Sequence, residues 1–157
     1  MSGTNPYAQA LGDRDPVATM RATADRIEAL TASWSPADFE RTYAPGKWTA
    51  RQILIHLAHS EMAMGHRARM GATEANYKAQ SFNQDSWLAK EQTLDARVAV
   101  AAFLAMSRMN SAWAASLSAA DLAAAVEHPA YGPVDVQWVI VAMAGHQLSH
   151  LKQLEQI

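Results

Sequence analysis

The clearest chemical signal in this chain is a pair of histidines four residues apart near its C-terminal end. His146 and His150 fall on the same three- and four-residue steps as Val139 and Met143, so they share an apolar helical seam. Residues four apart on a helix lie close enough for two imidazoles to bind one ion. A buried imidazole needs a polar partner, which a cation, buried water or a backbone carbonyl supplies. We interpret the pair as half of a metal site.

A third ligand is expected from another helix, and the predicted helix over 50–70 contains His56, His59, Glu61 and His66. At 100° per residue, His56 lies about 60° from the middle of the apolar side of this helix. His59 and His66 lie about 120° or more away, a direction that favours the surface, a neighbouring helix or another subunit. His56 is therefore the predicted third ligand, and Glu61, on the opposite flank, is a weaker candidate.

Three neutral imidazoles leave coordination positions open for water or substrate, as in catalytic rather than structural metal sites. The ligand type permits zinc, nickel, iron or cobalt, of which we favour zinc or nickel. The segment from His146 to His150 has Gln147 where zincin proteases have a glutamate base, so protease chemistry is disfavoured. We assign no catalytic residue from the sequence, and Glu61 is the nearest candidate for a base.

Helix start signals predict the elements that position these residues. Asp15 before Pro16 and the capping box of Thr49 and Gln52 each mark a helix start. Four long helices are predicted, over 16–32, 50–70, 94–117 and from about 135 to near the C-terminus. Short helices are expected after Ser35 and Ser118 and within the irregular stretch 71–93, and the segment 128–133 is expected to be a loop because of its prolines and glycine.

Composition favours an all-α protein. Half of the 157 residues are hydrophobic, 33 are alanine, and glycine and proline together number only 13. We predict one four-helix-bundle domain over 1–157, with 1–14 as a flexible N-terminal segment. The formal charge of −2 provides no broad positive field for nucleic acid or an anionic membrane, and cysteine is absent. No secretory signal or membrane span is recognised, so we expect a cytoplasmic protein.

Several segments together resemble the DinB-like superfamily, in particular its YfiT-like branch. They are Tyr43 to Gln52, Ile53 to Glu61, His128–Pro129 with Gly132, and Gly145 to His150. The resemblance implies a four-helix bundle, often dimeric, with one divalent ion held by His56, His146 and His150. Many relatives have an aspartate three residues after the first histidine, where this chain has His59, so the surroundings of the ion are expected to differ.

The resemblance covers several chemistries: thiol-dependent transferases and isomerases, proteins named as metal-dependent hydrolases, and members without an assigned reaction. Our leading hypothesis is a metal-dependent enzyme acting on a small molecule, either as a hydrolase or as a transferase using a low-molecular-weight thiol. The sequence does not require any carboxylate to lie beside the ion, where a hydrolase would use it as a base for water. This favours thiol transfer, because the ion itself activates a thiol. The alternative is a noncatalytic bundle, stabilised by metal or sensing it, that acts through protein association. We expect the chain to form a homodimer.

Other polar and aromatic residues receive structural interpretations. The arginines are predicted to be solvated or paired, with anion binding in a pocket as a less favoured role; they are Arg51, Arg67, Arg69, Arg97 and Arg108. His128, which precedes a proline, is predicted to shape a loop rather than to bind the ion. Trp48 is expected to pin the start of the second long helix.

Overall fold

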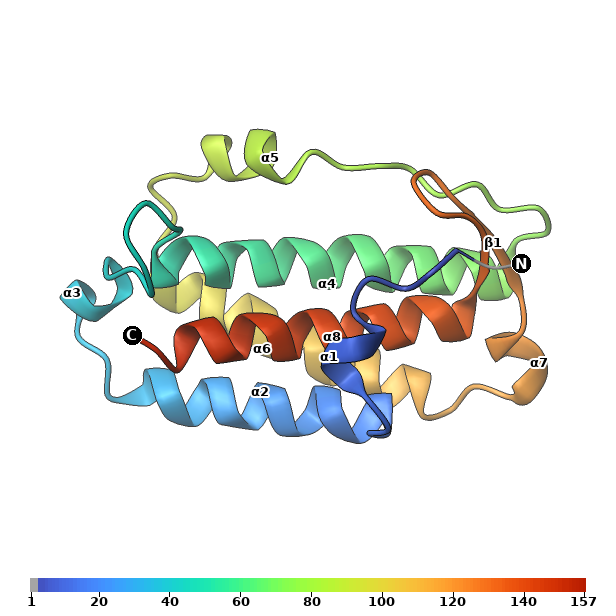
Figure 1. Cartoon of the computed structure of the whole chain (residues 1–157), viewed down its shortest axis with the longest axis horizontal. Coiled ribbons are helices and arrows are strands. Elements are labelled where there is room, and N and C mark those ends of the chain that lie inside the picture. Colours follow the sequence, from blue (N-terminus) through green and yellow to red (C-terminus); the bar gives the residue numbers. More distant parts are fainter. Residues whose placement is uncertain (1–2) are drawn as a thin grey trace.

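The computed structural model describes residues 3–157 and is a four-helix bundle, which confirms the predicted all-α fold (Figure 1). Its long helices are α2 (Pro16–Ala32), α4 (Ala50–Thr73), α6 (Ala96–Ala114) and α8 (Val136–Leu154). The predicted bounds agree for α2, whereas α4 extends three residues further and α6 is shorter at both ends. The short helices are α1 (Ala8–Leu11), α3 (Pro36–Phe39), α5 (Gln84–Lys90) and α7 (Ala119–Leu122).

The long helices start where the sequence places capping residues. The Asp15 side chain accepts a hydrogen bond from the backbone N–H of Ala18 at 2.7 Å at the start of α2. Thr49 and Gln52 form the reciprocal capping box that opens α4. The side chains of Asp95 and Asp135 accept hydrogen bonds from backbone N–H groups at the starts of α6 and α8, as Asp15 does in α2. Each cap provides an acceptor for N–H groups that have no partner within their own helix.

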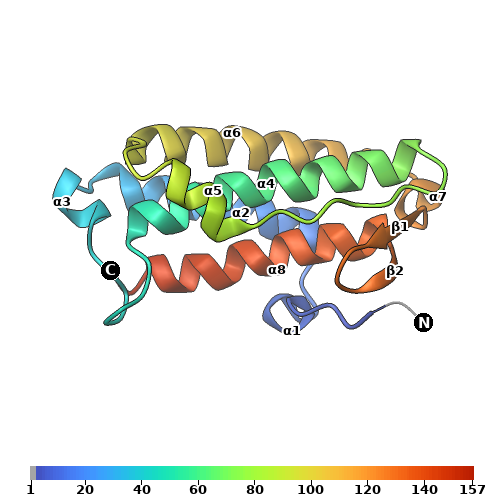
Figure 2. The same cartoon turned by 90° about the horizontal axis from the view of Figure 1, so that it is seen from above.

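Neighbouring helices in this bundle run parallel in two of the four pairs. In Figure 1, α4 and α6 both run from left to right, whereas α2 and α8 run from right to left. Each long helix packs against two others, so that α2 contacts α6 and α8, and α4 contacts the same two. Because α4 and α6 are parallel, the chain between them returns along the whole bundle, and this return carries α5 across α4 (Figure 2).

The segment before α8 is a short hairpin, so the prediction of a loop over 128–133 is wrong at both ends. Strand β1 (Ala125–His128) pairs antiparallel with β2 (Gly132–Asp135), and buried Val126 faces Val134. Gly132 has φ 68°, a conformation that glycine adopts at little cost. Each strand is only four residues long. An alternation of apolar and polar residues this short is not recognised in a sequence whose prolines indicate a loop.

The core consists of two apolar clusters with polar side chains between them. One cluster includes Ile53, Phe103 and Leu154, and the other includes Val139 and Met143. The polar side chains buried at the level between them are His56, Ser60, Glu61, Ser107, Asn110, Ser111, His146 and Gln147. The chemistry of the protein is therefore found in the middle of α4, α6 and α8 rather than at the ends of the bundle.

Residues 3–11 lie against α8, although the sequence predicts 1–14 to be flexible, a range whose first two residues lie outside the described part of the chain. The side chain of Asn5 donates a hydrogen bond to the backbone oxygen of Trp138 at 2.9 Å. A Cβ atom at Gly145 would collide with the backbone oxygen of Tyr7, so this glycine permits the close approach of the two segments. The mobility of the N-terminal segment stays a prediction.

Candidate metal centre

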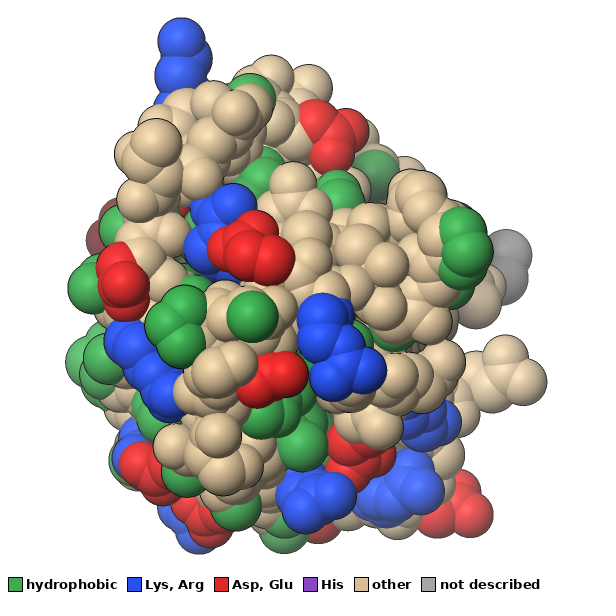
Figure 3. All heavy atoms as spheres, turned by 90° about the vertical axis from the view of Figure 1, so that its left-hand side faces the viewer, with side chains coloured by type: hydrophobic (Ala, Val, Ile, Leu, Met, Phe, Trp, Pro, Cys, Tyr) green, Lys and Arg blue, Asp and Glu red, His purple; other side chains and the backbone are tan. Residues whose placement is uncertain are grey.

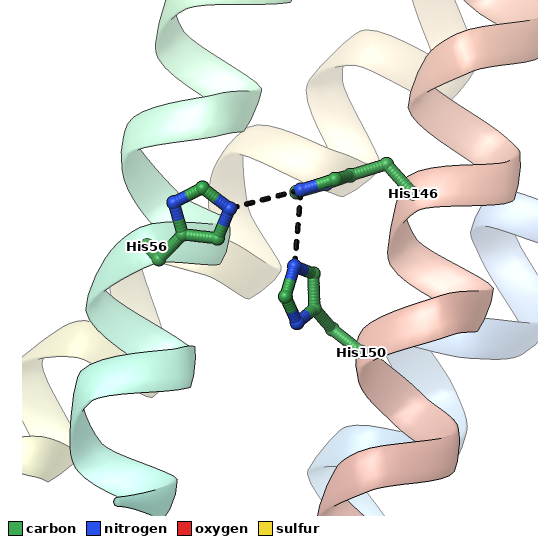
Figure 4. Close-up of side chains that lie close together, drawn as sticks. All are labelled: His56, His146 and His150. Carbon is green, nitrogen blue, oxygen red and sulfur yellow. Dashed lines mark hydrogen bonds between the residues drawn. The ribbon is translucent and has the colours of Figure 1, made fainter. Parts of the chain in front are cut away.

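Three histidines from two helices meet inside the bundle, as Figure 4 shows. His56 projects from α4, and His146 and His150 project from successive turns of α8. The Nε2 atom of His146 lies 2.9 Å from Nε2 of His56 and 3.1 Å from Nε2 of His150. His56 and His146 are buried, and His150 is partly buried. We call these three residues the histidine cluster; they are the residues that the sequence predicts as ligands.

Hydrogen bonding determines which nitrogen of His150 carries the proton. Its Nδ1 lies 2.7 Å from Oε1 of Gln153, an oxygen that only accepts, so Nδ1 is the donor. Neutral His150 therefore presents the Nε2 lone pair to Nε2 of His146. The same nitrogen of His146 faces His56, and a single ring nitrogen cannot accept from one neighbour while donating to the other. A cation between the rings would bind all three lone pairs.

The geometry of the histidine cluster fits such a cation. Zinc binds histidine nitrogen at about 2.0–2.1 Å, and tetrahedral coordination then separates the nitrogens by about 3.3 Å. The two Nε2 separations are 2.9 and 3.1 Å, and one nitrogen from each of the three rings lies within 4.8 Å of the others. Only small ring movements are needed to open the space for an ion. Three histidine ligands also leave a coordination position for another molecule.

Aromatic packing holds the two rings of the cluster that lack a second hydrogen bond. The Nδ1 atoms of His56 and His146 are buried without a partner among residues 3–157. The ring of Trp48 lies 5.0 Å from that of His56, and the ring of Tyr7 meets His146 edge-on at 5.1 Å. Tyr7 and Gln153 were not identified from the sequence; the spacing of Gln153, three residues after His150 on one helix, is the signal that marks it.

Burial keeps the histidine cluster neutral. Burial, together with the positive charges that His150 and His59 would carry, lowers the pKa of His56 to about 3. Burial also lowers the pKa of His146 and of His150, although the hydrogen bond to Gln153 opposes the shift in His150. At neutral pH the three imidazoles are therefore in the form that binds metals.

Two cavities border the histidine cluster from different sides. One, of about 280 Å³, is lined by the loop before α4, including Trp48, and by His150. The other, of about 180 Å³, is lined by His56, His146 and Arg67 among others. We call them the Trp48 cavity and the Arg67 cavity. Among the described residues, the side chains that line them are basic, hydroxyl, amide, thioether or apolar, and none is a carboxylate.

The remaining polar candidates on α4 lie away from the histidine cluster. His59 is buried beneath α5, where its Nε2 lies 2.8 Å from a carboxylate oxygen of Glu91. Glu61 is buried on another side of the helix and accepts hydrogen bonds from Asn110. His66 is exposed. Neither Glu61 nor His59 lines the two cavities, so Glu61 is not positioned as a base for the site.

Sequence comparisons relate the chain to metal-dependent proteins. The profile of the DinB superfamily matches residues 19–154. A protein of Oceanobacillus iheyensis named "putative metal-dependent hydrolase" is 21% identical over 132 residues, which are 83% of this chain and 76% of that protein. A protein of Bacillus licheniformis with the same name is 26% identical over 135 residues, which are 80% of this chain and 75% of the relative.

Solved structures share the fold. YfiT from Bacillus subtilis, described as "a probable metal-dependent hydrolase with an unusual four-helix bundle topology", aligns with a TM-score of 0.78 at 18% identity, over 89% of this chain and 83% of YfiT. A mycothiol-dependent maleylpyruvate isomerase aligns with a TM-score of 0.73 at 14% identity, over 88% of this chain and 59% of the isomerase. None of the helices in the described part of the chain is both long and apolar enough for a membrane span.

Proposed function

We propose that this chain, which belongs to the DinB superfamily, is a metal-dependent enzyme whose ion is held by His56, His146 and His150. The observation that carries the proposal is the convergence of three neutral ring nitrogens at one point beside two cavities. A structural metal site is closed by protein ligands, whereas three ligands leave room for a substrate. The names of the metal-dependent relatives support the same function.

The residues around the ion have separable roles in this proposal. The histidine cluster binds the ion, and Gln153 orients one of its rings. Trp48 and Tyr7 hold the other two rings and exclude water from them. When bound, the ion supplies a Lewis acid that lowers the pKa of a thiol or of water.

Thiol transfer is the reaction class that the surroundings favour. A hydrolase usually needs a base to take a proton from water, and Glu61, the candidate base from the sequence, lies outside both cavities. A thiol has less need of a base than water has, because its pKa of about 8.5 is already close to neutral pH. The two cavities provide separate places for a low-molecular-weight thiol and for the small molecule that accepts it. The resemblance in fold to a mycothiol-dependent isomerase supports this class.

The proposal includes the metal and the assembly. Three imidazoles suit zinc or nickel, with iron and cobalt as other metals that the ligand set accepts. We also propose a cytoplasmic homodimer. Met62 on α4 and Met109 on α6 are 52% and 58% exposed, and they provide apolar surface for such contact. Light scattering of the purified chain measures the assembly directly.

Metal analysis tests the site itself. The chain is purified without a histidine tag, and its metal content is measured by elemental analysis together with the variants H56A, H146A and H150A. We expect about one ion per chain in the wild type and a large loss in each variant. The matched control is H66A, which removes an exposed histidine from the same helix and should leave the content unchanged. Unchanged content in all three cluster variants contradicts the site.

Turnover tests the function. The metal-loaded chain is assayed with several bacterial thiols and electrophiles, and separately with panels of esters and amides. We expect thiol transfer, lost in H56A, H146A and H150A and retained in H66A. Turnover of esters or amides alone contradicts thiol transfer but supports a hydrolase. A bound ion with no turnover in either panel favours the noncatalytic alternative.

A further inference from the structure

Arg67 is a buried cation without an acidic partner. Arg67 is only 9% exposed, and no carboxylate oxygen of residues 3–157 lies within 4.0 Å of its guanidinium group. One N–H of the guanidinium donates to the backbone oxygen of Gln80. By contrast, several of the surface arginines and lysines on the face shown in Figure 3 lie beside an aspartate or a glutamate. A buried charge is costly unless an opposite charge compensates it, so Arg67 is poised for an anion.

His128 adds a second donor beside Arg67. Its Nδ1 accepts a hydrogen bond from the backbone N–H of Ala130 at 3.1 Å, which puts the proton of the neutral ring on Nε2. This Nε2 lies 3.3 Å from Nη1 of Arg67, so two N–H groups face each other with no acceptor between them. Burial and the charge of Arg67 lower the pKa of His128, which keeps this ring neutral. The pair presents one positive charge and two donors.

Arg67 belongs to the same helical stripe as His56. Positions 56, 60, 64 and 67 recur at steps of four, four and three, and all four residues line the Arg67 cavity. Arg67 is about 16 Å from His56 along the axis of α4, and side chains of a helix lean toward its N-terminus, here toward the histidine cluster. A molecule bound at Arg67 therefore shares one cavity with two of the three histidines.

The cavity between these ends is aromatic and small. Tyr131 and Trp138 pack together at 5.1 Å between ring centroids, and both contact the ring of His128. Phe82 also lines the cavity, with its ring centroid 6.0 Å from the guanidinium carbon of Arg67. The volume of about 180 Å³ slightly exceeds the roughly 150 Å³ of a cavity that holds benzene. Such a space suits a flat, benzoate-sized molecule.

We propose that Arg67 and His128 form an anion subsite that binds the carboxylate of a small, flat aromatic substrate, whose apolar body lies in the Arg67 cavity between this subsite and the histidine cluster. A carboxylate has one negative charge and two acceptor oxygens, which matches the one charge and the two donors. A phosphate monoester has a charge of about −1.5 to −2 at pH 7 and would remain unbalanced there. The role of the bound molecule as a substrate rests on the proposed function. Binding of a carboxylate at Arg67 and His128 does not depend on that function.

Ligand binding to the metal-free, full-length chain tests the subsite separately from the ion. Benzoate binding is measured by calorimetry and by the fluorescence of Trp138, which lines the cavity. We expect R67Q to weaken benzoate binding at least tenfold and R67K to weaken it less. R26Q is the matched control, because Arg26 is an exposed arginine on α2. In the wild type, benzyl alcohol should bind at least tenfold more weakly than benzoate, and inorganic phosphate should not displace benzoate at equal concentration.

Several outcomes overturn the inference. Benzoate affinity that is equal in folded R67Q and wild type removes Arg67 from the subsite, and equal affinity for benzyl alcohol removes the need for an anion. Phosphate that competes as well as benzoate shows a general anion site and contradicts the carboxylate assignment. If R67Q does not fold, the ¹⁵N resonance of the Arg67 side chain in the wild type tests whether Arg67 binds the carboxylate. This resonance should shift on addition of benzoate and not on addition of benzyl alcohol, and no shift with benzoate contradicts the inference. Loss of the proposed metal function leaves these binding results unchanged.

Discussion

Two buried polar clusters share helices α4 and α8, and they differ in how their polar atoms are paired. In the histidine cluster, three ring nitrogens face one another, and two further nitrogens have no partner. In the second cluster, which we call the Glu61 network, Glu61, Ser107, Asn110 and Gln147 mostly satisfy one another. His146 and Gln147 are adjacent in sequence, yet one belongs to each cluster.

The Glu61 network joins three helices, and none of its four residues lines the Trp48 cavity or the Arg67 cavity. Gln147 on α8 donates to Glu61 on α4 at 2.6 Å and to Ser107 on α6 at 3.1 Å. Asn110 donates to the Glu61 carboxylate at 2.9 Å and accepts from Arg69 at 2.7 Å. Within the Glu61 network, Oε1 of Gln147 is the one buried side-chain nitrogen or oxygen that lacks a partner among residues 3–157. The comparison teaches that paired polar atoms hold helices together, whereas ring nitrogens that face one another beside a cavity are available to the ion that we propose.

The largest expected effect separates metal binding from packing. H146A should weaken metal binding at least 100-fold, because it removes the ring that contacts both other histidines. By the same comparison, the Glu61 network variant N110A should retain one ion per chain. Metal affinity is measured by competition with a chelator of known affinity. Equal metal loss in H146A and N110A would show that the two clusters act as one unit.

The next effect concerns stability. N110A should lower the free energy of unfolding by about 2 kcal/mol, because it removes one hydrogen-bond partner from the buried Glu61 carboxylate and one from the partly buried Arg69. Denaturant unfolding of the metal-free chain measures this change. S116A, at an exposed serine, is the control and should change the stability little. A loss in N110A no larger than in S116A would refute the structural role of the network.

A smaller effect tests how far Gln153 supports the ion. Q153A should weaken metal binding about tenfold, or about 1.4 kcal/mol, because it removes the acceptor that fixes the tautomer of His150. Gln156, exposed on the same helical end, supplies the control Q156A. Metal affinities that are indistinguishable between Q153A and Q156A would exclude Gln153 from the site.

The smallest effect is a trend with pH. Burial raises the pKa of Glu61 above its ordinary value of 4.5, although hydrogen bonds from Asn110 and Gln147 oppose the shift. The folded chain then binds this proton more tightly than the unfolded chain, so stability falls as the pH rises above 4.5. E61Q resembles the neutral carboxyl and should lack this fall. Unfolding at pH 5 and at pH 8 measures both proteins, and parallel pH profiles would contradict a raised pKa.

Local signals in the sequence were sufficient for much of the fold. Asp15, Thr49 and Asp135 mark helix starts that the structure confirms, because capping depends on residues only three positions apart. The hairpin around Gly132 was missed, since its pairing depends on burial against α4 rather than on local propensity. The parallel arrangement of α4 and α6 was also not predicted, because a long connection permits either direction.

The sequence by itself determined the spacing of His146 and His150 and the side of α4 on which His56 lies, because helical periodicity follows from backbone geometry alone. Only the tertiary structure decided what the rings contact, from Tyr7 before α1 to Gln153 near the end of α8. Only the tertiary structure, likewise, brought Arg67 and His128 together, 61 residues apart in the chain. Contacts of this kind depend on how helices pack, and no local pattern in the sequence encodes them.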